Sequence, residues 1–414
     1  MPRMSMPSGA TPPAEPAKRK PPMRPATVVP AVLAVLVLAS VSVFFLRDRF
    51  FGSEAAPSTA SSSTVAAPLP PPVPPACGDG QELLSTMSLR DKVAQLLMVG
   101  VTGGGDARAV VANTHVGGIM IGSWTDLTML GDELKEIAST ASPLPLAVSV
   151  DEEGGRVSRL AKIIGVQESA RVLGQTSTPE QVYDIALKRG QAMKDLGMTM
   201  DFAPVVDVSD QPDDTVIGDR SFGADPAKVT EYAGAYARGL RDAGVTPVLK
   251  HFPGHGHASG DSHQGGVVTP PLSQLMDDDL VPYRSLVTQA PVAVMVGHMQ
   301  VPELTGSDPA SLTPAAYALL RNGTYGAPPF DGVVFTDDLS SMGAINQRYG
   351  VAEAVLKSLQ AGADVALWIT TDEVPEVLDR LEAAVNGGEL KLAQVDQSVL
   401  RVAASKGKSP QCGR

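Results

Sequence analysis

Most of the histidines in this chain are gathered in one short segment. Four of the six occur in Lys-His-Phe-Pro-Gly-His-Gly-His-Ala-Ser-Gly-Asp-Ser-His, which starts at Lys250 and contains His251, His255, His257 and His263. Histidines spaced this closely, with carboxylates nearby, can form a zinc site. Alternatively, Asp261 can hydrogen-bond the ring of His263 and so fix the tautomer of a proton donor. The segment therefore predicts either metal binding or acid/base catalysis.

A second candidate for chemistry is the pair of aspartates in Val-Val-Phe-Thr-Asp-Asp-Leu, at positions 337 and 338. A glycosidase that retains configuration needs a nucleophilic carboxylate on one face of the sugar and a proton donor to the leaving oxygen. Asp337 is the candidate nucleophile. Because neighbouring strand residues point to opposite sides, Asp338 is expected to turn away and cap a following helix.

Eight short apolar segments have the composition of strands that are buried on both faces of a parallel sheet. They span residues 93–101, 116–122, 145–151, 200–206, 247–251, 292–298, 333–337 and 363–368. Helical patterns fall between or after them, at residues 126–139, 179–196, 226–242, 280–289, 315–321, 351–361 and 374–386. This alternation predicts an α/β fold, a (β/α)8 TIM-type barrel, with a doubly wound parallel sheet as the alternative.

Polar side chains stand at or just past the ends of several predicted strands. They are Asp151, Asp207, Lys250, His251, His298 and Asp337. Active sites of such barrels lie at the C-terminal ends of the strands, so these residues stand where catalytic groups are expected.

Longer motifs occur in order along the predicted barrel. Residues 151–159 read Asp-Glu-Glu-Gly-Gly-Arg-Val-Ser-Arg, residues 217–223 read Ile-Gly-Asp-Arg-Ser-Phe-Gly, and residues 250–256 read Lys-His-Phe-Pro-Gly-His-Gly, with Asp-Ser-His at 261–263. Together with Thr336 and Asp337, they resemble the motifs of the single-domain β-N-acetylhexosaminidases of glycoside hydrolase family 3. Glu152 departs from the family pattern, which usually has Gln at that place.

The resemblance implies a role for each matching residue. Asp337 would be the nucleophile, and His263 the acid/base, oriented by Asp261. The sugar would be held by Asp151, Arg159, Arg220, Lys250 and His251. The implied reaction is hydrolysis of terminal, non-reducing β-linked N-acetylglucosamine through a covalent glycosyl-aspartate intermediate. Cell-wall fragments would be the substrates, and no metal or cofactor would be needed.

Other functions would use many of the same residues. A β-glucosidase or a glycoside phosphorylase of the same family would share most of this site. A metal-dependent barrel hydrolase could use His255, His257, His263 and Asp337 as ligands. A non-catalytic wall-binding protein could keep the pocket and lack the reaction.

The chain before the predicted barrel divides into three parts. Residues 1–25 are expected to be a disordered cytoplasmic tail, residues 26–46 an uncharged transmembrane helix, and residues 47–76 a linker rich in Pro, Ser and Ala. Basic residues before the apolar segment place the N-terminus in the cytoplasm and the catalytic barrel, residues 77–412, outside the cell membrane. A cleaved signal peptide is the alternative.

Composition limits the partners of the chain. The formal net charge is −12, and the absence of a basic cluster in the predicted barrel argues against nucleic acid. The expected partners are a carbohydrate substrate and the membrane, with the chain a monomer. Cys77 and Cys412 stand at the two ends of the predicted barrel, and in an exported chain this spacing suggests a disulfide, with two free thiols as the alternative.

Overall fold

The structure is a computed structural model, and it describes residues 80–407. The predicted tail (1–25), transmembrane helix (26–46), linker (47–76) and both cysteines lie outside the described residues. Within residues 80–407, every helix is too short or too polar to cross a bilayer.

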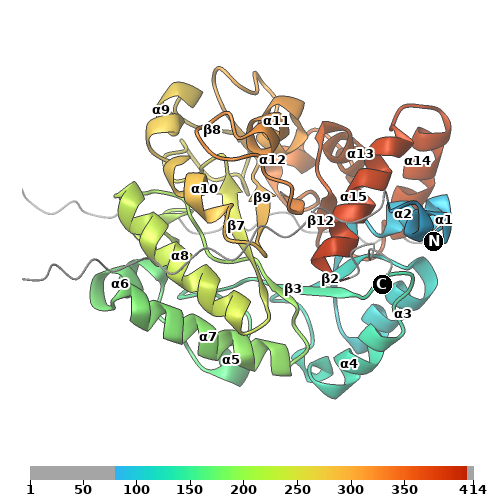
Figure 1. Ribbon diagram of the computed structural model, residues 1–414, viewed down its shortest axis with the longest axis horizontal. Coiled ribbons are helices and arrows are strands. Elements are labelled where there is room, and N and C mark those ends of the chain that lie inside the picture. Colours follow the sequence, from blue (N-terminus) through green and yellow to red (C-terminus); the bar gives the residue numbers. More distant parts are fainter. Residues whose placement is uncertain (1–79, 408–414) are drawn as a thin grey trace, which may run out of the picture. The chain divides into compact units, whose positions relative to one another are not determined.

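Eight parallel strands close into a barrel, and helices surround it (Figure 1). The strands are β1 (Leu97–Val101), β2 (Gly118–Ile121), β3 (Ala147–Val150), β6 (Met200–Asp201), β7 (Thr246–Phe252), β9 (Ala293–Val296), β11 (Val334–Asp338) and β12 (Val365–Trp368). Their order around the barrel is β1-β12-β11-β9-β7-β6-β3-β2. Each strand overlaps one of the eight predicted segments, with β7 extending past its segment by one residue at each end and β11 by one residue at its C-terminal end, so the predicted (β/α)8 barrel is confirmed.

The longer helices follow the barrel strands along the chain. They are α3 (Gly104–Thr114), α4 (Asp132–Ser139), α7 (Pro179–Asp195), α8 (Pro226–Asp242), α11 (Pro314–Asn322), α13 (Val351–Ala361), α14 (Val374–Asn386) and α15 (Leu392–Ser405). The shorter ones are α1 (Gln81–Ser85), α2 (Leu89–Ala94), α5 (Ala161–Ile164), α6 (Ala170–Thr176), α9 (Leu272–Asp277), α10 (Val281–Leu286) and α12 (Gly343–Asn346). Two long helices, α7 and α8, start with a proline after a side-chain cap from Thr178 and Asp225.

Several observed elements differ from the predicted ones, and three of these differences have a local cause. Val93 belongs to α2 rather than to a strand, because Ser88 and Asp91 form a capping box that starts a helix there. The predicted helix at 126–139 is interrupted at Gly131, whose φ of 90° separates the 3-10 turn η1 (Leu127–Met129) from α4. Helix α3 was not predicted, because its first residues are glycines.

Two small sheets lie outside the barrel. Strand β4 (Glu152–Gly154) pairs with β5 (Val157–Ser158), and β8 (Val267–Val268) pairs with β10 (Met299–Gln300). Between β4 and β5 the chain turns through Gly154 and Gly155, with φ of 91° and 54°. A Cβ at Gly154 would also lie 2.6 Å from the carbonyl oxygen of Glu168. The two glycines of the motif at 151–159 are therefore required by a tight hairpin.

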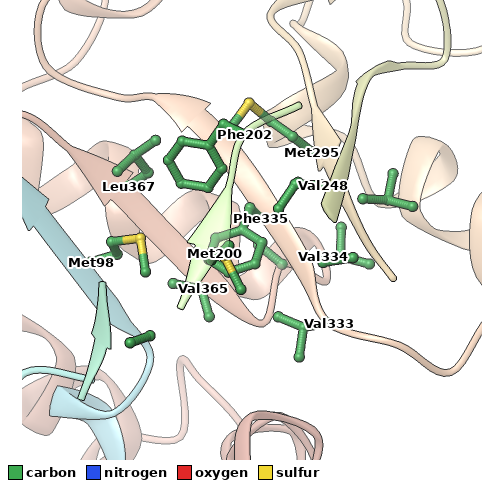
Figure 2. Close-up of a cluster of buried hydrophobic side chains, with 14 of the residues drawn as sticks. Met98, Met200, Phe202, Val248, Met295, Val333, Val334, Phe335, Val365 and Leu367 are labelled. Atoms are coloured by element: carbon green, nitrogen blue, oxygen red, sulfur yellow. The ribbon is translucent and has the colours of Figure 1, made fainter. Parts of the chain in front are cut away.

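The barrel interior is apolar. Figure 2 shows Met98, Met200, Phe202, Met295, Phe335, Val365 and Leu367 packed among the strands. The rings of Phe202 and Phe335 meet edge to face at a centroid distance of 5.7 Å. Phe202, Met295 and Leu367 also line a cavity at the C-terminal end of the barrel, so this end of the core forms the apolar part of its wall.

Candidate active site

A cavity of about 340 Å³ lies where β3, β7 and β11 end. All eight residues predicted to form the site line it. They are Asp151, Arg159, Arg220, Lys250, His251, Asp261, His263 and Asp337. Because the C-terminal ends of parallel strands meet at one end of a barrel, residues far apart in the sequence come together here.

Two cations and two carboxylates form one connected cluster in the wall. Lys250 donates to Asp151 and to Glu153, both at 2.6 Å. Arg220 makes two parallel hydrogen bonds of 2.8 Å to Glu153. Burial raises the pKa of Glu153, but Arg220 and Lys250 more than offset it, so that the pKa lies well below the usual range. We call Asp151, Glu153, Arg220 and Lys250 the charge cluster.

Arg159 is the contrasting cation. Its side chain has no ion-pair or hydrogen-bond partner among residues 80–407, and its Nε is buried. A guanidinium in a cavity wall carries several N–H donors, so Arg159 can donate to a bound molecule without breaking an existing contact.

His251 is held by a buried aspartate behind it. Its ring Nδ1 lies 2.7 Å from Asp207, which also accepts the backbone N–H groups of His251 and His255. Burial raises the pKa of Asp207, but His251 and these hydrogen bonds lower it below its usual range. Asp207 is therefore ionised and accepts a hydrogen bond from Nδ1–H, which leaves Nε2 directed toward Arg220 at 3.4 Å.

The predicted contact between Asp261 and His263 is present. The ring Nδ1 of His263 lies 2.7 Å from Asp261, and the backbone N–H of His263 donates to the same oxygen at 3.0 Å. The pKa of Asp261 is lowered, because hydrogen bonds from His263 outweigh the effect of burial. The carboxylate thus fixes Nδ1 as the donor and leaves Nε2 free, on a side chain that is 59% exposed.

Asp337 offers one oxygen to the cavity. Its Oδ1 accepts the backbone N–H of Asp338 at 2.9 Å, and Oδ2 accepts no hydrogen bond from the described part of the chain. Burial raises the pKa of Asp337, but His298, His251 and His263 together with that N–H lower it to about 2. An ionised carboxylate with one oxygen unengaged is suited to nucleophilic attack.

The prediction for Asp338 was wrong. Its carboxylate accepts from the backbone N–H groups and hydroxyls of Ser340 and Ser341, and so closes the turn after β11. Helix α12 begins later and has Met342 at its N-cap position. Asp338 also lines the cavity beside Asp337, because the chain leaves its strand geometry at this point.

His298, which ends a predicted strand, supports Asp337 from behind. Its Nε2 donates to the carbonyl oxygen of Asp338 at 2.8 Å, and its Nδ1 lies 2.7 Å from the hydroxyl of Ser311. A carbonyl can only accept, so Nε2 carries the proton. Burial lowers the pKa of His298, which is consistent with a neutral ring whose Nδ1 accepts from Ser311.

Three buried residues of this site were not among the predicted site residues. Asp207 and His298 were noted at strand ends, and Glu153 lies within a motif, but none was given a role. Each acts through another residue: Glu153 on Arg220, Asp207 on His251, and His298 on Asp338. For Asp207 and His298, the position at the end of a predicted strand was the available signal.

Glu152 points away from the cavity. It is fully buried and pairs with Arg189, while its Oε2 accepts the backbone N–H groups of Arg159 and Leu160 at 2.7 Å. The glutamate that departs from the family pattern therefore adds no charge to the cavity wall. It holds the end of the β4–β5 hairpin against α7.

The four ligands of the metal alternative are not brought together. Within the described residues, the group that could hold an ion consists of His257, Asp278 and Asp279. His257 Nδ1 lies 2.9 Å from Asp279, whereas His263 is bonded to Asp261. The histidine cluster is thus divided among different tasks.

Known proteins are similar to this chain in sequence and in fold. The family model described as "Glycosyl hydrolase family 3 N terminal domain" matches residues 88–405. The chain belongs to glycoside hydrolase family 3. A relative named Beta-hexosaminidase LpqI, from Mycobacterium tuberculosis, is 63% identical over 387 residues, which cover 93% of this chain and 99% of the relative.

Solved family 3 structures extend the comparison. A family 3 glycosyl hydrolase from Mycobacterium smegmatis has 74% sequence identity and a TM-score of 0.78, covering 78% of this chain and 98% of that one. A family 3 beta-N-acetylglucosaminidase from Paenibacillus has 34% identity and a TM-score of 0.73, covering 78% of this chain and 63% of that one. The chain is therefore an enzyme, a family 3 glycoside hydrolase of the β-hexosaminidase group.

Proposed function

We propose that the chain hydrolyses terminal, non-reducing β-linked N-acetylglucosamine with retention of configuration. The observation that carries this proposal is the pairing, in one cavity, of a carboxylate with a free oxygen and a histidine with a free Nε2. Asp337 is the nucleophile and His263 the acid/base. The names of the similar proteins favour a hexosamine over glucose as the sugar.

In the first step, Asp337 Oδ2 forms a bond to the anomeric carbon while the bond from that carbon to the leaving oxygen breaks. His263 Nε2–H transfers its proton to that oxygen, so the leaving group departs as an alcohol. In the second step, His263 Nε2 takes a proton from water, whose oxygen bonds to the anomeric carbon and releases Asp337. Asp261 keeps Nδ1 protonated throughout, so that proton transfer is confined to Nε2.

The sugar is held by groups that are already in place. Asp151 can accept from sugar hydroxyls, while Lys250 and Arg159 can donate to hydroxyls or to the N-acetyl carbonyl. Because the charge cluster fixes Lys250 and Arg220 before substrate arrives, binding requires little reorganisation. Trp124, which is 40% exposed at the cavity wall, offers a flat apolar face to the leaving sugar.

The test is release of chromophore from aryl β-N-acetylglucosaminide and aryl β-glucoside. The expected result is turnover of the N-acetyl substrate that persists with a chelator and is lost in Asp337→Ala. Proton NMR of the first-formed sugar should show the β anomer, and mass spectrometry after a slow substrate should find the sugar on the Asp337 peptide. Activity that survives Asp337→Ala would refute the mechanism.

Two further arms separate the alternatives. Faster turnover with inorganic phosphate, yielding a sugar phosphate, would identify a phosphorylase, and preference for the glucoside would identify a β-glucosidase. Loss of activity on chelation, restored by zinc, would favour metal-dependent hydrolysis.

We also propose that the natural substrates are cell-wall fragments and that the enzyme acts outside the cytoplasm, as a monomer anchored by residues 26–46. The apolar segment and the basic residues before it support this topology. Fractionation of cells, with protease accessibility of the barrel in intact spheroplasts, tests it; enzyme confined to the cytosolic fraction would refute it.

A further inference from the structure

The acid/base loop, residues 254–266, is tied down on the side that faces α12. The carbonyl oxygen of Ser262 accepts the backbone N–H of Ala344 at 3.1 Å. The carbonyl oxygen of His263 accepts that of Gly343 at 3.0 Å. The peptide units on both sides of His263 are therefore held by the segment that follows Asp338.

The side chain of Ser262 is held from the opposite side. Its hydroxyl lies 3.2 Å from Nε2 of His255, and both residues are buried, with 2% and 3% exposure. Ser262 stands between Asp261 and His263 in the sequence, so fixing its side chain fixes the turn that presents the acid/base. The contact joins the start of the acid/base loop, at His255, to the turn that carries His263.

The backbone at His255 is held in place by its neighbours. Its backbone N–H donates to the buried Asp207 at 2.8 Å. The next residue, Gly256, lies so close to the chain after β6 that a Cβ there would be 1.7 Å from the carbonyl oxygen of Val208. The ring of His255 is therefore mounted on backbone that cannot shift easily.

The His255 ring has Ser262 as its hydrogen-bond partner. Burial, assisted by His251, lowers the pKa of His255 to about 4, so the ring is neutral at neutral pH. Its Nδ1 is buried and has no hydrogen-bond partner among residues 80–407. Within the described residues, the Ser262 hydroxyl is thus the one hydrogen-bond partner of the ring, whose other polar neighbour, His251, meets it edge to face at a centroid distance of 5.9 Å.

We propose that His255 is a positioning residue that acts through Ser262 to hold His263 in the geometry for proton transfer. The proposal rests on the proposed function and adds a residue to it. If His255 only fills space, its loss should lower all rates alike. If His255 positions the acid, its loss should lower the rate most for substrates whose leaving group must be protonated, and least for those whose leaving group departs without a proton.

The experiment compares kcat/KM, which reports the first step, for two N-acetylglucosaminides. The dinitrophenyl glycoside departs without protonation, whereas the β-linked disaccharide of N-acetylglucosamine needs a proton. The variants are Ser262→Ala, His255→Asn and His255→Gln. Gln can place an amide atom near the position of Nε2, whereas Asn reaches only the Nδ1 position. Ser259→Ala, an exposed hydroxyl of the same loop, is the matched control.

Ser262→Ala and His255→Asn should lose about tenfold or more on the disaccharide and less than about threefold on the dinitrophenyl glycoside. His255→Gln should recover most of the loss, and Ser259→Ala should resemble the wild type. Equal losses on both substrates, or no loss on either, would overturn the proposal. If His255→Asn does not fold, as judged by circular dichroism, Ser262→Ala decides the question. A wild type inactive on both substrates would instead refute the proposed function, and the positioning role with it.

Discussion

The buried ion pair between Glu152 and Arg189 is expected to contribute to the stability of the fold and not to the activity of the enzyme. Glu152 is fully buried and the Arg189 side chain is 7% exposed. In Glu152→Gln the amide oxygen can still accept from the backbone N–H groups of Arg159 and Leu160. What is lost is the negative charge facing Arg189, which keeps a hydrogen bond to Gly165. Leaving one buried charge unpaired costs about 3 kcal/mol, a large share of the roughly 5–15 kcal/mol that stabilises a typical protein.

Urea unfolding followed by circular dichroism measures this cost. Glu231→Gln, at an exposed glutamate, should leave the free energy of unfolding unchanged. The double variant Glu152→Gln/Arg189→Met should recover much of the loss, because an apolar side chain of similar volume replaces the unpaired charge. Since Glu152 does not line the cavity, kcat/KM should stay within about twofold of the wild type. An unchanged unfolding midpoint, or a large loss of kcat/KM in the folded variant, would show that the pair has been misinterpreted.

Three other perturbations test the site. Glu153→Gln leaves Arg220 and Lys250 short of a counter-charge and should lower kcat/KM by about 100-fold, the equivalent of roughly 3 kcal/mol; a loss below tenfold in steady-state assays would argue against the charge cluster. Gly256→Ala should disable the acid/base loop through its collision with Val208, whereas Gly260→Ala, whose Cβ would lie 3.3 Å from a side chain, should be tolerated; equal activities of the two would contradict this. The lowered pKa of Asp337 means that its charge stabilises the fold above about pH 4, and that this contribution is lost as the pH falls toward 2. The difference in unfolding free energy between wild type and Asp337→Asn should therefore shrink between about pH 6 and pH 3, and a difference that grows on acidification would refute the assignment.

Much of the barrel could be predicted from the sequence, because strands buried on both faces are uniformly apolar. The segment at 333–337 illustrates this, since its apolar residues 333–335 are buried and Thr336 alone separates them from Asp337, which reaches the cavity. The segment at 200–206 shows the limit. Only Met200–Asp201 form a ladder, and pairing resumes as a single bridge from Val205 to Lys250. Composition reports burial, whereas ladder geometry depends on the neighbouring strands.

The site was predictable where a motif marks a residue that faces the cavity. The buried residues that hold the cavity-facing side chains in place could not be predicted, because their partners come from distant parts of the chain. Lys250 and Asp151 are 99 positions apart, and nothing local indicates that Glu153 joins them. Likewise, the sequence of the loop suggested several interchangeable histidines, and only the fold separates His255, which contacts Ser262, from His257, which contacts Asp279.

The charge cluster also determines what kind of electric field a substrate meets. Its two carboxylates and two cations sum to zero. The other charged residues of the wall, histidines apart, are Arg156 and Arg159 against Asp261, Asp337 and Asp338, so the formal sum is only −1. Opposite charges a few ångströms apart produce a strong field at contact that fades within a short distance, so these groups exert little pull on ions in bulk solution. Such a wall distinguishes molecules by the directions of their hydroxyl and amide groups. If the proposed uncharged N-acetylglucosaminide is the substrate, its capture by this enzyme should accordingly be almost insensitive to ionic strength.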